Sequence, residues 1–476
     1  MLFNTLEFAI FFVIVYTLYL VLDHKWQNRM LLVGSCIFYG AWDWRFLLLM
    51  FVSITTDFFC ARYIYESSDA RARKKILVLN FIVNLGILGF FKYFNFFTES
   101  LQSLLHVFGF SIKANFLHII LPVGISFYTF QAMSYAFDVY RKQLTPAKNF
   151  LDYALFVTYF PQLVAGPIER ANHLLPQVLK PRQLTLEKFY EGCYLIFWGL
   201  FLKVFVADNL AKIADPLFAS GGPYSSIGVL IALYAFAFQI YGDFAGYSNI
   251  ARGLGKCMGF DIMVNFNLPY FATNPSDFWK RWHISLSSWL RDYLYIPLGG
   301  NKNGNFNTYR NLGITMLLGG LWHGATWLFV LWGAYQGLLL IIYKLLKPFL
   351  SAIKDIRNSL LAKIWFWVRV ILFFHITCLG WLIFRVRSIP QLFQMGRSLF
   401  YQFDFSLDAD LKNNASRIMF FICILLIVQL RQYYKNDLLV VLKDNSLFKG
   451  VFYFVIFYLL LMFGVEGGKE FIYFQF

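Results

Sequence analysis

The chain has 476 residues, of which 59% are hydrophobic, 21% aromatic and only 14% charged. Soluble proteins average about 25% charged residues, so this composition excludes an ordinary soluble globular protein. The net charge of +16 could suggest nucleic-acid binding, but in so apolar a chain it is expected from basic cytoplasmic loops. We therefore expect no nucleic-acid partner.

Apolar runs of membrane-spanning length recur from end to end, since ~20 helical residues cross a hydrocarbon core of ~30 Å. The runs lack the alternation of a barrel. They predict an all-α polytopic membrane protein of about ten crossing helices, organised as a single domain over 1–476. In chain order the predicted crossings are 6–22, 30–41, 45–64, 76–97, 117–139, 189–207, 227–247, 364–384, 416–430 and 449–464.

Features at the N-terminal end orient the chain. The first run, Phe8–Leu22, follows Glu7 and lacks a small-residue cleavage site, which predicts a retained helix rather than a signal peptide. The stretch 66–75 carries four basic residues and is predicted to be a cytoplasmic loop, which places the N-terminus outside. The nearly uncharged stretch 98–116 is then an outer loop.

Two later features are read from glycine, proline and charge. Pro122 and Gly124 predict a kink in helix 117–139. The apolar run 150–168 has basic residues on both flanks and contains Pro161, Gly166 and Pro167. A segment that dips into the membrane and returns fits these flanks, provided that its non-helical backbone is buried in protein.

Three polar stretches separate the later crossings. Residues 208–226 are predicted to be a weakly charged outer loop. Residues 250–310 form the longest polar stretch and are predicted to be short amphipathic helices lying on the cytoplasmic face. The segment 385–415 has mixed charge and receives no assignment.

The stretch 311–343 is too long for one ordinary crossing and somewhat short for two. Arg310 precedes it, and Lys344, Lys347 and Lys354 follow, so both flanks are basic. This pattern predicts a re-entrant helical hairpin that enters from the cytoplasm and turns near Gly319–Gly324, with His323 at or near its tip.

His323 is the first candidate catalytic residue, because an ionisable group at membrane depth is costly and marks a functional site by default. Trp322 and Trp327 could form the walls of a pocket around it. A neutral imidazole there can act as a general base on an attacking hydroxyl. The alternative is a core histidine that caps a broken helix.

His283 is the second candidate, within SDFWKRWHISLSSWLRDYLYIPLGG (276–300). Trp279, Trp282, Leu286 and Trp289 or Leu290 share one helical face, which is typical of packing against a membrane. A polar network under His323 could include Arg281, His283, Arg291 and Asp292. Two histidines 40 residues apart, with no third ligand implied, do not predict a metal site. Nor do the six cysteines, which lack CxxC spacing and indicate no disulfide framework.

The other ionisable residues have plainer interpretations. Asp243 lies in an apolar helix and needs a partner, for which Arg281 or a backbone donor is possible. His375 could be packed or functional, and the remaining histidines, His24, His106, His118 and His173, are expected to be solvated. The motifs GxSxG, Walker A, GxGxxG and HxxxxD are absent, so a soluble-type nucleophile elbow or nucleotide fold is not supported.

Several blocks together resemble the membrane-bound O-acyltransferase family, and within it the bacterial polysaccharide branch with the alginate O-acetyltransferase membrane subunit. They include RWH (281–283) followed by SSWLRDYLYIPLGG (287–300), and LGGLWHGATW (318–327). The others are ILPVGISFYTFQAMSYAFDVYR (120–141), YFPQLVAGPIER (159–170), YGDFAGYSNIARGLG (241–255) and the terminal FIYFQF. The motifs define a catalytic core over 117–345.

The resemblance implies a multi-helix fold with re-entrant parts and a central tunnel, the invariant family histidine at His323 and a second polar position at His283. It implies transfer of an acetyl group from cytoplasmic acetyl-coenzyme A, a substrate rather than a bound cofactor, to an extracytoplasmic polysaccharide hydroxyl. It also implies a periplasmic or surface esterase-like partner and a bacterial inner-membrane location. Asp243, Arg281, Trp282, Asp292 and Trp322 are the candidate tunnel residues.

Alternatives stay open at this point. The acceptor could be alginate or another exopolysaccharide, cellulose, peptidoglycan, or teichoic acid that receives D-alanine, although the length and the FIYFQF ending favour the alginate-type branch over the teichoic-acid one. A covalent acyl-enzyme relay is possible, but no Ser or Cys nucleophile is evidently paired with His323. Two readings from other classes are a transporter or flippase with a proton relay, for which no inverted repeat is found, and a non-catalytic scaffold.

Overall fold

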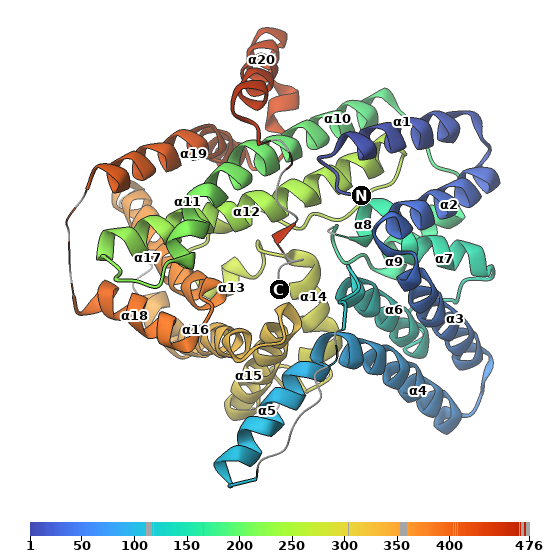
Figure 1. The fold of residues 1–476 in the computed structure, drawn as a ribbon. Helices are drawn as coiled ribbons and strands as arrows, with labels where there is room; N and C mark the ends of the chain where they lie inside the picture. The colour runs from blue at the N-terminus through green and yellow to red at the C-terminus, as the bar shows by residue number, and fades with distance from the viewer. Residues whose placement is uncertain are drawn as a thin grey trace. The chain divides into compact units, whose positions relative to one another are not determined.

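Helices make up all the regular secondary structure in the part of the chain that is described, which is every residue except 111–116, 118, 165, 303, 353–358, 403, 405, 407, 466, 468–470 and 473–476 (Figure 1). In this computed structural model, eight helical stretches among those residues are long and apolar enough to cross a membrane. The shorter apolar helix α1 (Leu6–Val21) adds to them. The predicted all-α polytopic membrane protein is confirmed, although the helices at two of the ten predicted crossings, 30–41 and 117–139, are not among these spans.

The first compact unit comprises Met1–Cys193 and Ile250–Met263. Its helices begin with α1, and the others are α2 (His24–Asp43), α3 (Arg45–Glu66), α4 (Ala70–Leu88), η1 (Gly89–Tyr93), α5 (Phe94–Val107), α6 (Ile125–Tyr140), α7 (Phe150–Thr158), α8 (Phe160–Leu163) and α9 (Ala171–Leu179). Helices α3, α4 and α6 pack on one another. The single domain over 1–476 stays a prediction.

Two predicted loops in this unit are wrong. Residues 70–107 form one continuous helical stretch of 38 residues, so 98–107 are helical rather than an outer loop. The cytoplasmic loop 66–75 shrinks to 67–69, because Asp69 caps α4 by accepting a hydrogen bond from the Arg71 amide. His118 and residues 111–116 of the outer loop lie outside the described residues.

The predicted kink at Pro122 and Gly124 is also wrong, because α6 begins only at Ile125. Gly124 precedes it with φ 75°, and a Cβ there would lie 2.7 Å from the carbonyl oxygen of Leu163. Glycine is thus required both by the left-handed backbone and by the close approach. Helix α7 has nine residues, about 14 Å, which is too short for a crossing, as the sequence predicted for 150–168.

The second compact unit comprises Tyr194–Asn249 and Val264–Phe476. The helices that lie in it wholly or in part are α10 (Leu186–Leu200), η2 (Phe201–Ala207), α11 (Asp208–Ala219), α12 (Ser226–Cys257), η3 (Pro269–Phe271), α13 (Pro275–Phe278), α14 (Ile284–Leu290), η4 (Arg291–Tyr295), α15 (Gly304–His323), α16 (Trp327–Ala352), α17 (Ser359–Arg385), α18 (Ile389–Phe400), α19 (Ala409–Lys435), η5 (Val440–Lys443) and α20 (Ser446–Phe463).

Two further predictions fail in this unit. Residues 186–219 form one helical stretch of 34 residues, so the predicted outer loop 208–226 is mostly helix α11. The polar stretch 250–310 does not lie on a surface as amphipathic helices. Helix α12 continues to Cys257, α13 is buried through Phe278, and α14 is buried through Leu286 and Trp289. The unassigned segment 385–415 contains α18 and the start of α19.

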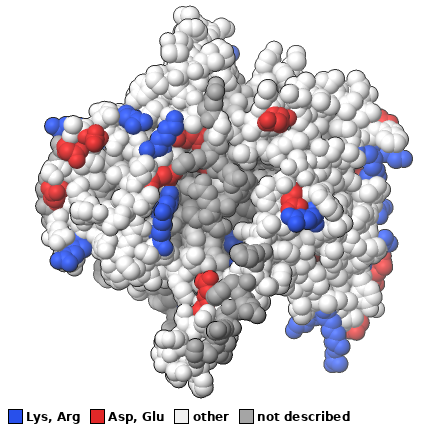
Figure 2. All heavy atoms as spheres, in the orientation of Figure 1, with Lys and Arg blue, Asp and Glu red and all other residues white. Residues whose placement is uncertain are grey.

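The surface is as apolar as a lipid-facing protein requires. On the face in Figure 2, acidic and basic side chains, some of them side by side, are scattered over a mostly uncharged surface. Large apolar side chains are exposed along α1, α4, α16 and α20. Such a surface would be an aggregation liability in water and matches a hydrocarbon environment.

Candidate active site

A helical hairpin positions His323. Helices α15 and α16 make the most extensive helix–helix contact among the described elements and run side by side (Figure 1). The predicted hairpin is confirmed, but it is longer than 311–343, and its helices of 20 and 26 residues are about 30 and 39 Å long. Trp327–Phe349 within α16 is long and apolar enough to cross a membrane, whereas α15 is not among such helices, and the re-entrant course of the hairpin stays a prediction.

The turn of the hairpin lies at 324–326, so Gly319 and Gly320 are helical rather than part of the turn. A Cβ at Gly320 would collide with the carbonyl oxygen of Phe329 and lie 2.9 Å from the Cα of Gly333. Small residues let two helix backbones approach this closely. Gly320 and Gly333 therefore allow the two helices to pack closely just before the turn. This close packing fixes the position of His323, the last residue of α15.

The His323 side chain is buried, with 4% of the residue exposed. Its ring is nearly perpendicular to Trp322 and Trp332, with centroids 5.0 and 4.9 Å away, and to Phe384 at 5.6 Å. Trp327, predicted as a wall, is instead 58% exposed. Its place is taken by Trp332, five residues further along α16, and by Phe384 of α17.

His283 lies beside His323, with ring centroids 6.4 Å apart. It is fully buried against Trp322 and Phe244, whose ring centroids are 5.7 and 4.6 Å away. The fold thus brings together two histidines 40 positions apart in the sequence. This proximity is necessary if both belong to one active site.

A strained backbone and a polar cluster orient His283. The residue precedes α14 with φ 43°, a left-handed conformation that is uncommon outside glycine and typical of functional positions. Its Nδ1 lies 3.2 Å from Oδ1 of Asn265, which also accepts hydrogen bonds from the Ser285 hydroxyl and amide. Because that oxygen only accepts, His283 donates from Nδ1–H, and Nε2 keeps its lone pair.

His283 lies outside the membrane-spanning helices, and burial lowers its pKa to about 3. The charged form is disfavoured because the protein interior solvates an imidazolium poorly. His283 is therefore a neutral hydrogen-bonding group at physiological pH. It cannot supply positive charge to a bound donor.

Asp243 lies in a buried ion cluster that the sequence did not predict. Lys203 Nζ lies 2.6 Å from Oδ1 of Asp243 and 2.9 Å from Oδ1 of Asp208, and these side chains are no more than 4% exposed. The Ile472 amide donates to Oδ2 of Asp243. The expected backbone donor is confirmed and Arg281 as partner is wrong. Lysine within the apolar run 189–207 was the available signal.

The same cluster anchors the C-terminal segment against the site. Phe471, fully buried, packs on Phe244 and Tyr247 with centroid distances of 5.3 and 4.9 Å. Phe244 in turn contacts the His283 ring. Phe471 therefore packs on the same phenyl ring that contacts His283. Residues 473–476 of FIYFQF lie outside the described residues.

The predicted network of Arg281, His283, Arg291 and Asp292 is wrong. Arg281 pairs with Asp277 at 2.8 Å, and Arg291 pairs with its neighbour Asp292 at 2.7 Å, where both are partly exposed. His283, by contrast, is fully buried. Trp282 does belong to the site region, since it is 1% exposed and packs on Phe278 and Trp381.

The remaining histidines have local partners or exposed positions. His375 lies 2.8 Å from the Tyr234 hydroxyl and 2.7 Å from the Ile371 carbonyl. His24, expected to be solvated, is half-buried and contacts the Val178 carbonyl, and His173 pairs with Glu169, whereas His106 is exposed. Among the described residues, no cluster of His, Cys, Asp and Glu could hold a metal ion, and the six cysteines form no disulfide.

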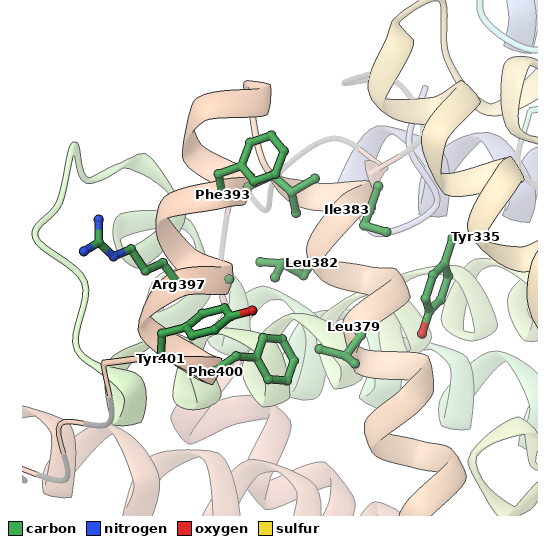
Figure 3. Close-up of a pocket in the computed structure, with 10 residues that line it drawn as sticks. Tyr335, Leu379, Leu382, Ile383, Phe393, Arg397, Phe400 and Tyr401 are labelled. Atoms are coloured by element: carbon green, nitrogen blue, oxygen red, sulfur yellow. The ribbon is translucent and has the colours of Figure 1, made fainter.

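A cavity of about 630 Å³ lies between α16, α17 and α18 (Figure 3). Its lining is almost entirely apolar, with Leu379, Leu382 and Ile383 on α17 and Phe393 and Phe400 on α18. In Figure 3 the guanidinium of Arg397 points away from this space. Neither His283 nor His323 lines it, so it is not the space in which the histidines act.

Comparison with known proteins gives the site a context. Residues 144–383, half of the chain, match the model of the family described as MBOAT, membrane-bound O-acyltransferase. A protein named "Probable alginate O-acetylase AlgI", from Pseudomonas aeruginosa, is 42% identical over 84% of this chain and 75% of its own. A Helicobacter pylori protein named "Peptidoglycan O-acetyltransferase" is 35% identical over 82% and 78%. A Bacillus subtilis "Teichoic acid D-alanyltransferase" is 28% identical over 55% and 68%.

Proposed function

The chain belongs to the membrane-bound O-acyltransferase family and is a multi-pass membrane O-acyltransferase, and on this premise we propose that it acetylates a polysaccharide outside the bacterial inner membrane. The relatives named for alginate O-acetylation support an alginate-like polysaccharide as the acceptor over peptidoglycan, because their identity to this chain is higher. The teichoic-acid relative matches a smaller part of the chain.

The observation that carries the mechanism is the buried pair of imidazoles. His323, at the tip of the hairpin, acts as general base and removes the proton from an acceptor hydroxyl. The resulting oxygen attacks the thioester carbonyl of acetyl-coenzyme A. The C–O bond forms, the C–S bond breaks, and the proton passes to the departing thiolate.

His283 serves as a positioning group beside His323. Its Nδ1–H is held by Asn265, so Nε2 is presented as an acceptor in a fixed direction. Trp322, Trp332 and Phe384 exclude water from the imidazole, which limits hydrolysis of the thioester. The acyl donor reaches this point from the cytoplasmic side through a tunnel between the helices. The acceptor hydroxyl belongs either to the polymer itself or to an esterase-like protein outside the membrane, which then passes the acetyl group to the polymer.

The test is His323→Ala, assayed for transfer of labelled acetyl groups from acetyl-coenzyme A by the purified protein with its membrane level verified. Loss of a general base costs about 10²–10⁴-fold in rate, and we expect a loss of that size. His375→Ala is the matched control, since His375 is hydrogen-bonded elsewhere on α17. Transfer at the normal rate by the His323 variant would refute the assignment, and transport without transfer by the unaltered protein would favour the flippase reading.

A further inference from the structure

The cavity between α16, α17 and α18 takes no part in the proposed mechanism, and its lining indicates what kind of molecule fills it (Figure 3). Its volume of about 630 Å³ lies within the ~300–1,000 Å³ of small-molecule sites. Apart from one arginine and two tyrosines, it is lined by leucine, isoleucine, phenylalanine and glycine. A lining of this kind suits a hydrocarbon ligand.

Helix α18, which forms one wall, has the polarity of a lipid-facing helix. Its buried side chains include the polar residues Gln391 and Ser398, which donate hydrogen bonds to backbone carbonyls within 218–224. Its exposed side chains include Phe393 and Phe400, which line the cavity and are 72% and 55% exposed. An exposed apolar face of this kind suits hydrocarbon and not water. The open side of the cavity therefore faces the acyl chains of the membrane.

Arg397 places a positive charge at the rim of the cavity. The residue is exposed, and its guanidinium forms no ion pair with any carboxylate that the structure describes. In Figure 3 the guanidinium points out of the cavity. A cation on a lipid-facing helix is costly unless it reaches the headgroup region, which the long arginine side chain does by snorkelling.

The depth of the cavity allows this reach. Helix α17 has 27 residues and is about 40 Å long, which exceeds the ~30 Å of the hydrocarbon core. Its cavity-lining residues lie within 379–383, in the last two turns before Arg385. Helix α18 is joined to α17 by the three residues 386–388. The cavity is therefore at the edge of the hydrocarbon core, where acyl chains meet their phosphates.

We propose that this cavity binds an acyl chain of a membrane glycerophospholipid, and that Arg397 binds the phosphate of the same molecule at the rim. Arginine pairs with phosphate through two parallel charge-assisted hydrogen bonds. The acyl chain supplies the dispersion contacts that an apolar lining forfeits when no atoms fill the space beside it. The site goes beyond the proposed function, because its ligand is neither the acetyl donor nor the acceptor.

The bound lipid contacts the two helices that surround the candidate catalytic base. Ile383 lines the cavity and directly precedes Phe384, whose ring lies 5.6 Å from that of His323. Tyr335 also lines the cavity, and it lies three residues after Trp332, whose ring is 4.9 Å from that of His323. An acyl chain between α18 and these helices should therefore stabilise them.

A membrane-spanning helix of a partner protein is the competing occupant. Such a helix is about 10–12 Å wide with its side chains, and a specific protein interface buries about 800 Å² on each partner. An apolar helix would also cover the rim without offering Arg397 a negative charge. A phospholipid satisfies both the apolar lining and the cation, and the experiment separates the two occupants.

The first measurement is binding of dioleoylphosphatidylglycerol to the delipidated full-length protein in detergent micelles, followed by native mass spectrometry. Arg397→Gln should weaken binding by roughly 10-fold or more, the size of a lost charged hydrogen bond. Dioleoylglycerol, which lacks the phosphate, should bind the unaltered protein and this variant equally weakly. Lys212→Gln is the matched control, because it removes an exposed cation from α11, outside this cavity.

The second measurement fills the cavity from within. A Cβ at Gly396 meets nothing within 4 Å, so the leucine of Gly396→Leu has room in the cavity that this glycine lines and should remove retention of the lipid. Added lipid should raise the Tm of the unaltered protein but not that of this variant. Gly86→Leu, at an exposed position of α4 with an equally free Cβ, should behave as the unaltered protein.

Three results would overturn the proposal: unchanged lipid binding in Arg397→Gln, unchanged lipid binding in Gly396→Leu, or a retained partner protein that Gly396→Leu releases in place of a lipid. His323→Ala should bind the lipid as the unaltered protein does. Failure of the catalytic assignment and failure of the lipid site are therefore distinguishable.

Discussion

Replacement of Lys203 by methionine should destabilise the protein more than almost any other single change of similar volume. The ammonium group lies within 2.9 Å of two carboxylates, those of Asp208 and Asp243, and these side chains are no more than 4% exposed. Methionine fills much of the space but leaves both carboxylates buried without their cation. Breaking a buried ion pair in this way costs about 3–5 kcal/mol.

The consequence should reach the active site, because Asp243 holds the Ile472 amide and the C-terminal segment supports Phe244 behind His283. We therefore expect Lys203→Met to lower both the unfolding free energy in mixed micelles and the acetyl-transfer rate. Lys212→Met, on the same helical stretch but exposed, should change the unfolding free energy by only about 0.5 kcal/mol or less.

A neutral cluster provides the decisive comparison. The triple variant Lys203→Met, Asp208→Asn, Asp243→Asn removes the uncompensated charge and should recover most of the lost stability, since neutral replacements of buried ion groups are often tolerated. An unfolding free energy of Lys203→Met within 1 kcal/mol of the unaltered protein, or no recovery in the triple variant, would refute the reasoning.

Three further outcomes are expected. Gly320→Ala should cost about 1–3 kcal/mol by overpacking and reduce transfer, because its methyl group collides with the Phe329 carbonyl; Gly313→Ala, whose Cβ would meet nothing within 4 Å, should be tolerated, and equal melting temperatures would contradict this. Phe471→Ala should cost about 3–5 kcal/mol, as for other buried aromatics, and slow transfer; unchanged stability would exclude the supporting role. The pKa of His283 is about 3 in the folded protein and ~6.5 in the unfolded chain, so the folded state binds fewer protons between these values. The free energy of unfolding should therefore fall by about 2 kcal/mol from pH 6.5 to pH 5 through His283 alone. The variant His283→Gln should lack this component, and an identical pH dependence in both proteins would show that His283 titrates normally.

Local sequence features predicted the elements that depend on length and hydrophobicity. The apolar runs located the long helices, but most of these helices extend well beyond the predicted bounds, as α19 (Ala409–Lys435) does beyond 416–430. The basic flanks of 311–343 predicted that α15 and α16 form a hairpin. Where polar residues continued a helix, the prediction failed. Residues 98–107 and 208–219 were assigned to loops, yet their backbones are helical because tertiary contacts and the preceding helix outweigh weak local hydrophobicity.

The candidate site divides in the same way. The cost of an ionisable group among apolar residues pointed to His323 and Asp243 without knowledge of the fold. Their surroundings did not follow, since Arg281 was placed beside Asp243 and Trp327 beside His323.

What the sequence by itself determined is therefore the class of protein and the residues too polar for their surroundings, because these depend on burial costs that each segment carries alone. Only the tertiary structure decided which partners offset those costs. Lys203 meets Asp243 across 40 positions, and Ile472 meets it across 229. Such pairings depend on how helices pack, and many packings satisfy the same hydrophobic pattern.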